Sequence, residues 1–497
     1  MFTASHSFRK TSRPGVAAGP FQWESYPRSH LHLPETQTLF GGKMDPSLSQ
    51  QIKKEAQNLG FDLVGIAPAT EAPHWDRLCE WVERGFHAGM EYIPRRLSAY
   101  RHPSGVLPGC RSLVMVAASY PPVPLANIPL GVGRIAAYAT RTDYHTVLRE
   151  KLRLLAHFIE ALIPGTQTRP AVDTAPLMER SFGWLAGLGW IGKNTMLLHP
   201  RVGSYILLGA VLTTAELPPD PPFPKNYCGR CQACLEVCPT GALVAPFTLD
   251  ARRCISYWTI EAKSLPPGQL RPFFDQWFFG CDLCQQVCPW NRRILRSGGV
   301  PGTRSPLVVE ARQLPPHIAM CEVLRASDSI LRQWFRDTPL WRAKPAGLRR
   351  NAAIVLGNCL RKEMCSHVTI CSDAVSRSDI GPSNISSRSV TPNGQQTSSS
   401  IRPPRDFPES AVQPLSPRAD DWQEVLTSAL QDPNPCVRRA AAWALAGRPT
   451  ATVRSTLHEV LARETDPDVR QEISALLSEI SAASTSSGQA PYPKALD

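Results

Sequence analysis

The chain has 497 residues, enough for two or three domains, and its 42% hydrophobic and 19% charged residues fit a globular protein with some linker. No apolar run approaches the length that spans a bilayer, so no membrane association is expected. The 15 cysteines, partly clustered, indicate metal ligation in a reducing compartment rather than a secreted disulfide framework. The net charge of +12 suggests a polyanionic partner, nucleic acid first, although a basic protein without such a partner is equally compatible.

The first 43 residues differ from the remainder of the chain. They are rich in Ser, His, Pro and Arg, show no apolar periodicity and lack the hydrophobic region of a secretory signal. Met44 is then followed by Asp45-Pro46, a favourable helix start, and apolar residues recur at helical spacing until Gly60. We therefore expect residues 1–43 to be a disordered extension and the folded protein to begin at Met44.

Residues 44–216 combine strand-like and helix-like patterns. Apolar runs at 61–67, 113–118 and 205–212 predict buried strands, and 147–162 predicts a long amphipathic helix. Strands separated by helices predict a layered α/β domain, so the expected fold class is a multidomain α+β protein.

From residue 337 onward the pattern is helical and repetitive. The stretches that open with Pro345, Pro435 and Pro467 resemble one another, each with arginine after the proline and the first two followed by small residues. Proline starts a helix and small residues let helices pack closely, so these copies predict a HEAT-like α-solenoid. The expected segments are a first repeat over 301–365, a disordered Ser- and Pro-rich insertion over 366–418, further repeats over 419–483 and a disordered tail over 484–497.

Two runs of cysteine mark residues 217–300 as a ferredoxin-like module. The first run is Cys228-x2-Cys231-x2-Cys234-x3-Cys238-Pro, the second is Cys281-x2-Cys284-x3-Cys288-Pro, and Cys254 lies between them. In two-cluster ferredoxins the cysteine before proline binds the other cluster. Two 4Fe–4S clusters are therefore expected, with crossed ligand sets: Cys228, Cys231, Cys234 and Cys288; and Cys238, Cys254, Cys281 and Cys284. Zinc is the alternative, but zinc sites seldom use this spacing twice.

The residues do not name an electron acceptor. No GxGxxG follows a predicted strand, so no flavin or nicotinamide site is indicated. Asp143-Tyr-His145 resembles a cobalamin-binding DxHxxG motif, but Leu148 replaces the required glycine. We interpret His145 as a residue at a helix start, not as a cobalt ligand.

Three further stretches resemble the epoxyqueuosine reductase family. They are Val-Asp-Thr-Ala-Pro-Leu-Met-Glu-Arg at 172–180, Gly-Leu-Gly-Trp-Ile-Gly-Lys-Asn-Thr at 187–195 and Leu-Asp-Ala-Arg-Arg-Cys-Ile-Ser-Tyr at 249–257. The resemblance runs from about Met44 to Leu360 and resumes in the solenoid. It implies reduction of epoxyqueuosine to queuosine at the wobble position of tRNA, with cobalamin and two 4Fe–4S clusters. It also implies a cytoplasmic enzyme, expected to be a monomer, with an unidentified electron donor.

The resemblance implies that Asp173 is the proton donor. A carboxyl group in an enclosed pocket can have its pKa raised enough to donate a proton at neutral pH. The alternative for Asp173 is a turn or cap residue before a helix that opens at Pro176.

The resemblance also implies a cobalamin site and a tRNA surface. Cobalamin would bind base-off between the α/β domain and the cluster module, where the candidate contacts are Arg96, Ala136, Tyr138, Asp173, Lys193, Asn194, Leu197, Ser256, Cys281 and Asp282. The candidate tRNA contacts are Lys263, Arg349, Arg350, Arg438 and Arg439. Each of these residues has a structural alternative, and for the arginines that alternative is an ion pair within or between repeats.

Two other functions are weighed against this one. A corrinoid reductive dehalogenase would share cobalamin and two clusters, but such enzymes usually carry a twin-arginine export signal, which Arg9-Lys10 without an apolar stretch does not supply. They also lack the solenoid and the 172–180 stretch. A non-enzymatic nucleic-acid-binding protein with structural clusters is the second alternative.

Overall fold

The computed structural model describes residues 46–309, 313–373 and 419–485. The predicted extension over 1–43 lies outside the described residues, as does most of the predicted insertion over 366–418. Residues 45–497 form one compact unit. No helix in the described ranges combines the length and hydropathy needed to cross a membrane.

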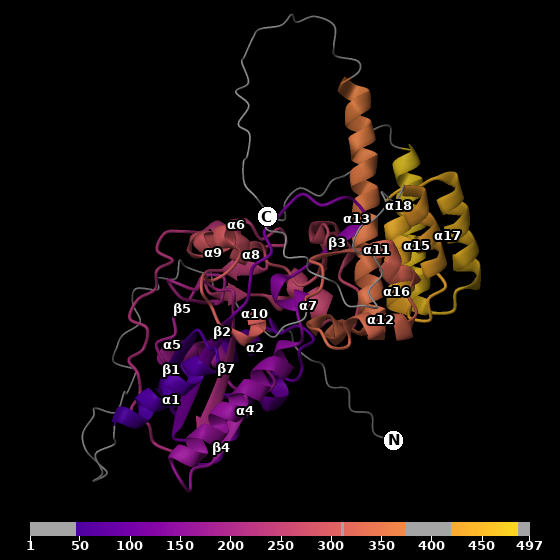
Figure 1. The fold of residues 1–497 in the computed structure, drawn as a ribbon. Helices are drawn as coiled ribbons and strands as arrows, with labels where there is room; N and C mark the ends of the chain where they lie inside the picture. The colour runs from indigo at the N-terminus through magenta and orange to yellow at the C-terminus, as the bar shows by residue number, and fades with distance from the viewer. Residues whose placement is uncertain (1–45, 310–312, 374–418, 486–497) are drawn as a thin grey trace, which may run out of the picture. The chain divides into compact units, whose positions relative to one another are not determined.

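A four-stranded sheet forms the core of the N-terminal part of this unit (Figure 1). Its strand order is β1-β2-β7-β4, with β1 Leu63–Pro68, β2 Ser112–Ser119, β7 Ile206–Thr213 and β4 Thr168–Ala171. The predicted strands and layers are present, but all three neighbouring pairs are antiparallel. The segment between β1 and β2 contains only short helices, not a single crossover helix that would return the chain for parallel pairing.

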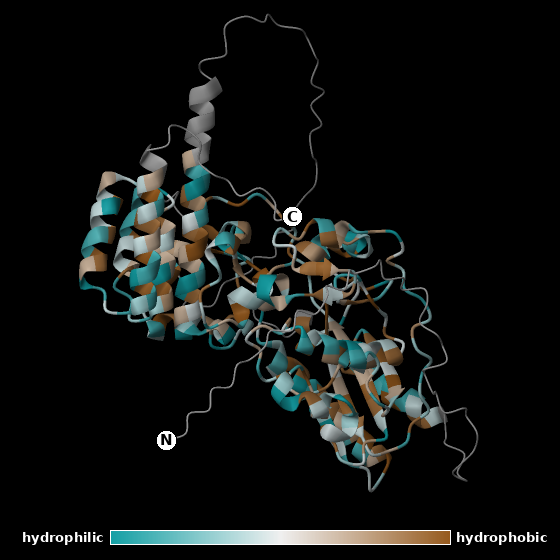
Figure 2. Cartoon of the chain, turned by 180° about the vertical axis from the view of Figure 1, so that it is seen from behind, coloured by the Kyte–Doolittle hydropathy of each residue, from teal (hydrophilic) through white to brown (hydrophobic). Residues whose placement is uncertain are grey.

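Helices cover both faces of this sheet. Helix α1 (Pro46–Asn58) and helix α4 (Tyr144–Leu162) pack on the face that carries Val114 and Val116, and helix α5 (Glu179–Leu185) packs on the face that carries Leu113 and Met115. Every residue of β2 is therefore buried, which is why its sequence is a continuous apolar run without alternation. Figure 2 shows the hydrophobic strands between helices whose outer faces are hydrophilic.

Short elements connect the strands and approach the functional residues. The loop elements are α2 (Trp75–Glu83), η3 (Pro94–Arg96), α3 (Leu97–Tyr100), η4 (Pro103–Gly105) and η5 (Ala137–Thr140). A small hairpin, β5 (Trp190–Ile191) with β6 (Leu197–Leu198), follows α5.

A second, three-stranded sheet joins parts of the chain that were predicted as separate domains. Its order is β10-β3-β11, with β10 Trp277–Phe279, β3 Val132–Ile135 and β11 His317–Ala319. These strands come from the segments 44–216, 217–300 and 301–365, so the predicted boundaries at 216 and 300 do not separate independently packed bodies. One hydrophobic cluster continues from Ile135 in this sheet to Ile480 in the last helix.

The cysteine region consists of short helices and turns. Its elements are α6 (Ala233–Glu236), β8 (Leu243–Ala245), β9 (Thr248–Leu249), η6 (Ala251–Arg253), α7 (Ile255–Ile260), η7 (Gly268–Phe274), α8 (Leu283–Gln286), η8 (Pro289–Asn291), α9 (Arg292–Ser297) and α10 (Pro306–Val309). Helices α6 and α8, each within a cysteine run, pack against one another.

The C-terminal part is an array of helices, as the repeats predict. Its elements are α11 (Met320–Arg325), α12 (Asp328–Phe335), η9 (Pro339–Ala343), α13 (Lys344–Asp373), α15 (Ala419–Ala429), α16 (Pro435–Leu445), α17 (Ala451–Arg463) and α18 (Pro467–Thr485). Pro435 and Pro467 open α16 and α18, and Pro345 lies in the first turn of α13. Helix α16 packs against both α13 and α18 (Figure 1).

Small residues allow the close approach of α13 and α16. A Cβ atom added to Gly357 would lie 2.8 Å from the Cα atom of Ala444. Helix α13 also continues beyond the predicted end of the first repeat at 365, so residues 366–373 are helical and not part of a disordered insertion. Likewise, α18 ends at Thr485, within the segment predicted as a tail.

Candidate functional site

The seven cysteines of the two runs and Cys254 between them lie close enough to influence one another. Burial raises the pKa of Cys288 to about 11, and the nearby thiols of the first run (Cys228, Cys231 and Cys234) add to this effect. In the second predicted ligand set, burial raises the pKa of Cys281, with contributions from neighbouring Cys284 and Cys254. Cys254 in turn is influenced by Cys238. Cys284 is influenced by Cys254 and Cys238 of its own predicted set and also by Cys234 of the other set, so the division into crossed ligand sets stays a prediction.

Each predicted set of four cysteine thiols suits a four-iron cluster in number and chemistry. Thiolates are the soft ligands that hold iron and sulfide. Among the described residues, no three His, Cys, Asp or Glu side chains converge closely enough to share a single metal ion. A cubane cluster is wider than one ion and holds its four thiolates further apart.

The turn of the β5–β6 hairpin holds both cysteine loops. Lys193 Nζ donates hydrogen bonds to the carbonyl oxygens of Gly229, at 2.8 Å, and of Cys231, at 2.9 Å. Asn194 is buried, and its Nδ2 donates to the carbonyl oxygen of Cys284 at 3.3 Å. These hydrogen bonds tie both side chains to the cysteine loops. Leu197 in the same hairpin is buried in the core.

Asp173 lies in a strained turn immediately after β4. Its φ of 55° is unusual for a residue other than glycine, although aspartate tolerates it better than most. The Asp173 N–H donates to Glu179 Oε1 at 2.7 Å, and this hydrogen bond fixes the turn. The Asp173 side chain is 61% exposed, and the helix begins at Glu179, not at Pro176. Asp173 is therefore a turn residue, but not a cap of the following helix.

A hydrogen-bonded chain links Asp173 to the start of α4. His145 Nε2 lies 3.1 Å from Asp173 Oδ2, and His145 Nδ1 lies 2.8 Å from Asp143 Oδ1. Asp143 also caps α4 by accepting the His145 N–H at 3.0 Å. The Tyr144 ring stacks on the imidazole at 4.1 Å, and the Tyr144 side chain hydrogen-bonds to Asp173. His145 is a helix-start residue as predicted, but its side chain also contacts the candidate proton donor.

The pKa shifts in this chain correct the expectation for Asp173. The hydrogen bond from His145 lowers the pKa of Asp173, and this effect exceeds the opposing effect of burial. Burial opposes the charged imidazole, but the hydrogen bonds to Asp143 and Asp173 outweigh it and raise the pKa of His145 to about 9. Burial, with help from the charge of Asp173, raises the pKa of Glu179 to about 8. At neutral pH the protons therefore reside on His145 and Glu179, and Asp173 is ionised.

Several of the predicted cofactor contacts lie around the hydrogen-bonded residues Asp143, His145 and Asp173. Arg96 Nη1 donates to the carbonyl oxygen of Thr174 at 3.2 Å. Tyr138 packs edge-on against Tyr144, with ring centroids 6.1 Å apart. Ala136 is buried against the turn at Gly280. A Cβ atom added to Gly280 would lie 2.5 Å from the Ala136 Cβ.

The Gly280 turn leads directly to the second cysteine run. Asp282 is buried, and its Oδ2 accepts the Ala137 N–H at 2.7 Å, while burial raises the Asp282 pKa to about 6. Cys281 precedes Asp282, and Gly280 N–H donates to Thr259 Oγ1 at 2.9 Å in α7, the helix that carries Ser256. The structure thus brings Arg96, Tyr138 and Asp173 close together. Ala136 and Asp282 connect this place with the cysteines of the second run.

Most of the predicted tRNA contacts are structural. Arg350 is 1% exposed, and its guanidinium group donates to the carbonyl oxygens of Ala262 and Trp258, so its assignment to the tRNA surface was wrong. Arg349 is nearly buried and pairs with Asp328 and Asp432. These contacts fasten α13 to its neighbours.

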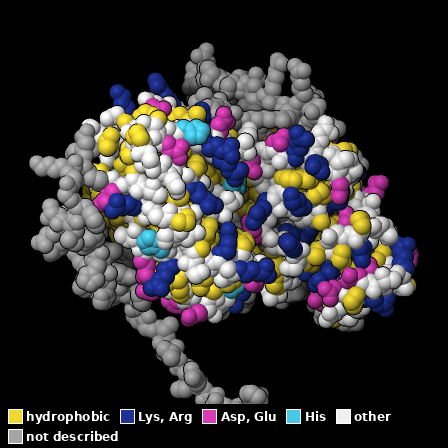
Figure 3. Space-filling view, turned by 90° about the horizontal axis from the view of Figure 1, so that it is seen from below, with side chains coloured by type: hydrophobic (Ala, Val, Ile, Leu, Met, Phe, Trp, Pro, Cys, Tyr) yellow, Lys and Arg dark blue, Asp and Glu magenta, His cyan; other side chains and the backbone are white. Residues whose placement is uncertain are grey.

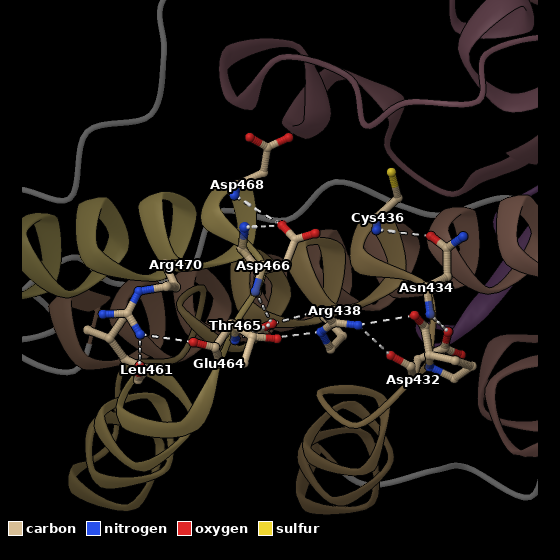
Figure 4. Close-up of polar contacts among 12 residues, drawn as sticks. Asp432, Asn434, Cys436, Arg438, Leu461, Glu464, Thr465, Asp466, Asp468 and Arg470 are labelled. Carbon is tan, nitrogen blue, oxygen red and sulfur yellow. Dashed lines mark hydrogen bonds and ion pairs between the residues drawn. The ribbon is translucent and has the colours of Figure 1, made fainter.

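The second pair of arginines joins adjacent repeats. Arg438 Nε and Nη2 each lie 2.8 Å from a carboxylate oxygen of Glu464, and Nη1 also donates to the carbonyl oxygen of Asp432 (Figure 4). Arg439 pairs with Glu472 at 3.1 Å and with Asp468 at 3.5 Å. The ion-pair alternative therefore describes these arginines better than a free phosphate-binding role.

Lys263 differs from the arginines because it is exposed. Figure 3 shows Lys and Arg side chains gathered across the middle of the face seen from below. Such a surface attracts a polyanion.

Sequence reasoning missed Asp143, His145, Tyr144 and Glu179 as a connected site. The segments 143–145 and 173–179 are separated along the chain, and only the packing of α4 beside β4 brings them together. The signal available was the polar Asp-Tyr-His run, which was interpreted as a broken cobalamin motif at a helix start and not as part of a site.

Three protein families match segments of the chain. A family described as a 4Fe-4S double cluster binding domain matches residues 227–291, which contain all eight ligand candidates. A family described as epoxyqueuosine reductase QueG, DUF1730, matches residues 101–174, and HEAT repeats match residues 411–487.

Curated relatives are more than one-third identical to this chain over the aligned residues. An epoxyqueuosine reductase of Pseudomonas aeruginosa is 38% identical over 319 residues, which cover 63% of this chain and 86% of the relative. An epoxyqueuosine reductase of Gloeobacter violaceus is 41% identical over 314 residues, which cover 62% of this chain and 95% of the relative.

Solved structures resemble the fold as well. An epoxyqueuosine reductase with an epoxyqueuosine-modified tRNA-Tyr stem loop matches with a TM-score of 0.69 and 25% identity over 88% of this chain and 99% of that one. The Bacillus subtilis epoxyqueuosine reductase, in a structure with its catalytic aspartate loop swung out of the active site, matches with a TM-score of 0.68 and 25% identity over 87% and 98%.

Proposed function

This chain belongs to the epoxyqueuosine reductase family, and from that premise we infer that it reduces epoxyqueuosine to queuosine in tRNA. Relatives at 38% and 41% identity, most of whose length it covers, carry this activity in their names. The family excludes a reductive dehalogenase and a non-enzymatic binding protein as its primary role. The relatives named epoxyqueuosine reductase make it an oxidoreductase, and the matched double-cluster domain fits that chemistry.

The reaction fixes how many protons the chain must deliver. Converting an epoxide to an alkene with release of water consumes two electrons and two protons. The epoxide oxygen takes up both protons and departs as water. The two electrons replace those lost with the C–O bonds, so that a double bond forms between the two carbons. A single carboxyl group supplies only one of these protons.

The observation that carries our assignment of the proton pathway is the chain Asp143–His145–Asp173. Asp173 is at the open mouth of the site, and His145 behind it holds a proton at neutral pH between two carboxylates. We assign proton donation to Asp173, with the proton drawn through its hydrogen bond to His145. His145 is then a positioning residue that supplies Asp173, and Asp143 holds the imidazole in the required orientation.

Glu179 has a supporting role in the same pathway. It fixes the Asp173 backbone in its strained turn, and its own carboxyl group is protonated at neutral pH. A second charge next to the ionised Asp173 is thereby avoided. A loop that closes only when this hydrogen bond forms would bring the donor to the substrate when needed.

Two cofactors complete the proposed site. The two thiol groups would hold the clusters, which carry electrons singly toward the active site. Cobalamin, when bound, supplies a low-valent cobalt that delivers electrons to the epoxide. The Asp173 side chain is 61% exposed and Tyr92 is 39% exposed, so both are accessible to a large cofactor or a nucleotide.

Of the residues predicted to bind cobalamin, Arg96, Tyr138 and Asp173 are best placed to face this opening. Ala136, Ser256, Cys281 and Asp282 support it from the cluster side. Lys193, Asn194 and Leu197 instead position the loops that carry the thiols. For tRNA, Lys263 keeps its proposed role as a phosphate contact, and we place the reaction in the cytoplasm with a monomeric enzyme and an electron donor of unspecified identity.

Anaerobic reconstitution tests this function. The protein loaded with iron, sulfide and cobalamin should convert tRNA that carries epoxyqueuosine into tRNA that carries queuosine when a strong reductant is present. Nucleoside analysis by mass spectrometry measures the product. Full loading with both cofactors and no queuosine under these conditions would contradict the proposal.

A further inference from the structure

A pocket of about 150 Å³ lies directly beside the Asp173 turn and has a strongly basic lining. The backbone of 170–176 forms one wall. The side chains of Arg96 from η3, Arg149 from α4 and Arg169 from β4 form the rest, so three separate elements direct arginines to one space.

Two of the three guanidinium groups are held by backbone carbonyl groups. Arg169 Nη1 donates to the carbonyl oxygen of Val106 at 2.8 Å, and Arg96 donates to the carbonyl oxygens of Thr174 and Tyr92. In the described part of the chain, none of the three forms an ion pair with a carboxylate, unlike Arg349, Arg438 and Arg439 in the solenoid. Three like charges around one pocket repel each other unless an anion lies between them.

We propose that Arg96, Arg149 and Arg169 form a phosphodiester-binding pocket that anchors a ligand next to Asp173. Planar guanidinium groups match the geometry of phosphate oxygens and bind them with paired hydrogen bonds. This inference rests on the proposed function, which brings two phosphodiesters to the site: the tRNA backbone around the reacting nucleotide and the nucleotide tail of cobalamin. Anchoring either one at this distance from Asp173 would fix the reacting groups relative to the proton donor.

The test uses the double variant Arg149→Ala/Arg169→Ala in the full-length, anaerobically reconstituted protein. Arg153→Ala is the matched control because Arg153 is exposed on the same helix, one turn further along, and does not line the pocket. Binding of a fluorescent anticodon stem–loop RNA is followed by anisotropy at several salt concentrations, and binding of cobalamin by its absorbance. Thermal unfolding shows whether each variant is folded.

We expect the double variant to bind one of the two ligands at least about tenfold more weakly, as for the loss of hydrogen bonds to a charged group. Weaker binding of RNA alone, with a salt slope reduced by about 0.7 for each lost phosphate contact, identifies the tRNA backbone as the ligand. Weaker binding of cobalamin alone identifies its nucleotide phosphate.

Affinities for both ligands equal to those of Arg153→Ala, in a variant with the thermal stability of the wild type, would overturn the proposal. Turnover is not measured in this experiment, so a wild-type protein that binds both ligands leaves the proposed function standing even if the pocket proves irrelevant. A wild-type protein that binds neither would contradict the proposed function itself, and the pocket with it.

Discussion

At the scale of single residues, His145 decides how Asp173 can act. An isolated exposed aspartate has lost its proton long before neutral pH. Contact with an imidazole whose pKa is raised to about 9 gives Asp173 a proton source that remains filled at physiological pH. In the proposed pathway, proton donation therefore depends on the pair of His145 and Asp173, and not on a pKa of Asp173 raised by an enclosed pocket.

Replacing His145 with Gln tests this pair. The imidazole pKa is raised from its usual 6.5 to about 9, so in the folded wild type the proton is retained at neutral pH and lost as the pH rises through about 9. The rate of epoxide reduction should fall above pH 9 in the wild type. His145→Gln should lower the rate at neutral pH by about 10²-fold or more and remove this alkaline limb, because an amide cannot carry the proton. An unchanged pH profile in the variant would show that His145 does not supply Asp173.

Glu179 offers a sharper comparison because its two simplest substitutions should behave differently. Glu179→Gln retains a carbonyl oxygen that can accept the Asp173 N–H, and it resembles the protonated carboxyl group that a pKa of about 8 implies. Glu179→Ala removes the acceptor, and the strained turn at φ 55° loses its support. We expect near wild-type turnover for the first variant and a loss of about tenfold or more for the second, with tRNA affinity unchanged.

The raised pKa of Glu179 also predicts a change in the stability of the fold with pH. Because the folded pKa of Glu179 is raised from 4.5 to about 8, its contribution is present below pH 4.5 and is lost as the pH rises through about 8. The thermal unfolding temperature of Glu179→Gln should therefore fall less between pH 5 and 8 than that of the wild type. Parallel curves for the two proteins would mean that Glu179 is ionised in the fold.

At the scale of elements, the solenoid arginines illustrate why a repeated motif can mislead. Arg438 follows the helix-opening proline, a position that suggested an exposed phosphate contact. Its side chain is 15% exposed and grips Glu464, which is 6% exposed, across the junction of two repeats. Burial and pairing between repeats depend on packing that a local motif does not record.

Two substitutions separate structure from tRNA binding. Arg438→Ala leaves the carboxylate of Glu464 buried without its partner and should destabilise the fold by about 3 kcal/mol, measured by chemical denaturation, with little effect on the tRNA affinity of the remaining folded protein. Lys263→Ala should weaken tRNA binding and leave stability unchanged, because Lys263 is exposed. The opposite pattern would restore Arg438 to the tRNA surface.

Individual elements were more predictable than their arrangement. Apolar runs and helix-start residues located β1, β2, β7 and α4 to within a few residues, since those patterns arise from local burial. The antiparallel order β1-β2-β7-β4 depends on which strands pair, and this is decided by contacts distant in sequence.

At the scale of the whole molecule, the cysteine runs and the three-stranded sheet both join distant segments. The ligand spacing predicts two crossed sets of cysteine ligands, because cluster binding imposes such spacing. No comparable pattern announced that β3, β10 and β11 would share a sheet, so the chain looked more modular than it is. Likewise, motifs predict the cofactor side of the site, whereas the contacts of the proposed proton pathway appear only in the fold.

Iron content tests the crossed groups. The wild-type protein should hold about eight irons, and Cys254→Ala should reduce this toward four by removing a ligand from the second cluster. Cys79→Ala is the matched control because Cys79 belongs to neither run. Retention of about eight irons by Cys254→Ala would show that another residue completes the cluster.

The most direct test of the whole account is single-turnover reduction of epoxyqueuosine-containing tRNA by the anaerobically loaded enzyme and by Asp173→Asn. The amide preserves the shape of the side chain but has no acidic proton. We predict that the wild type forms queuosine and that the variant binds the same tRNA with unchanged affinity yet reacts at least about 10²-fold more slowly. A variant that forms queuosine as fast as the wild type would contradict the assignment of Asp173 as the proton donor.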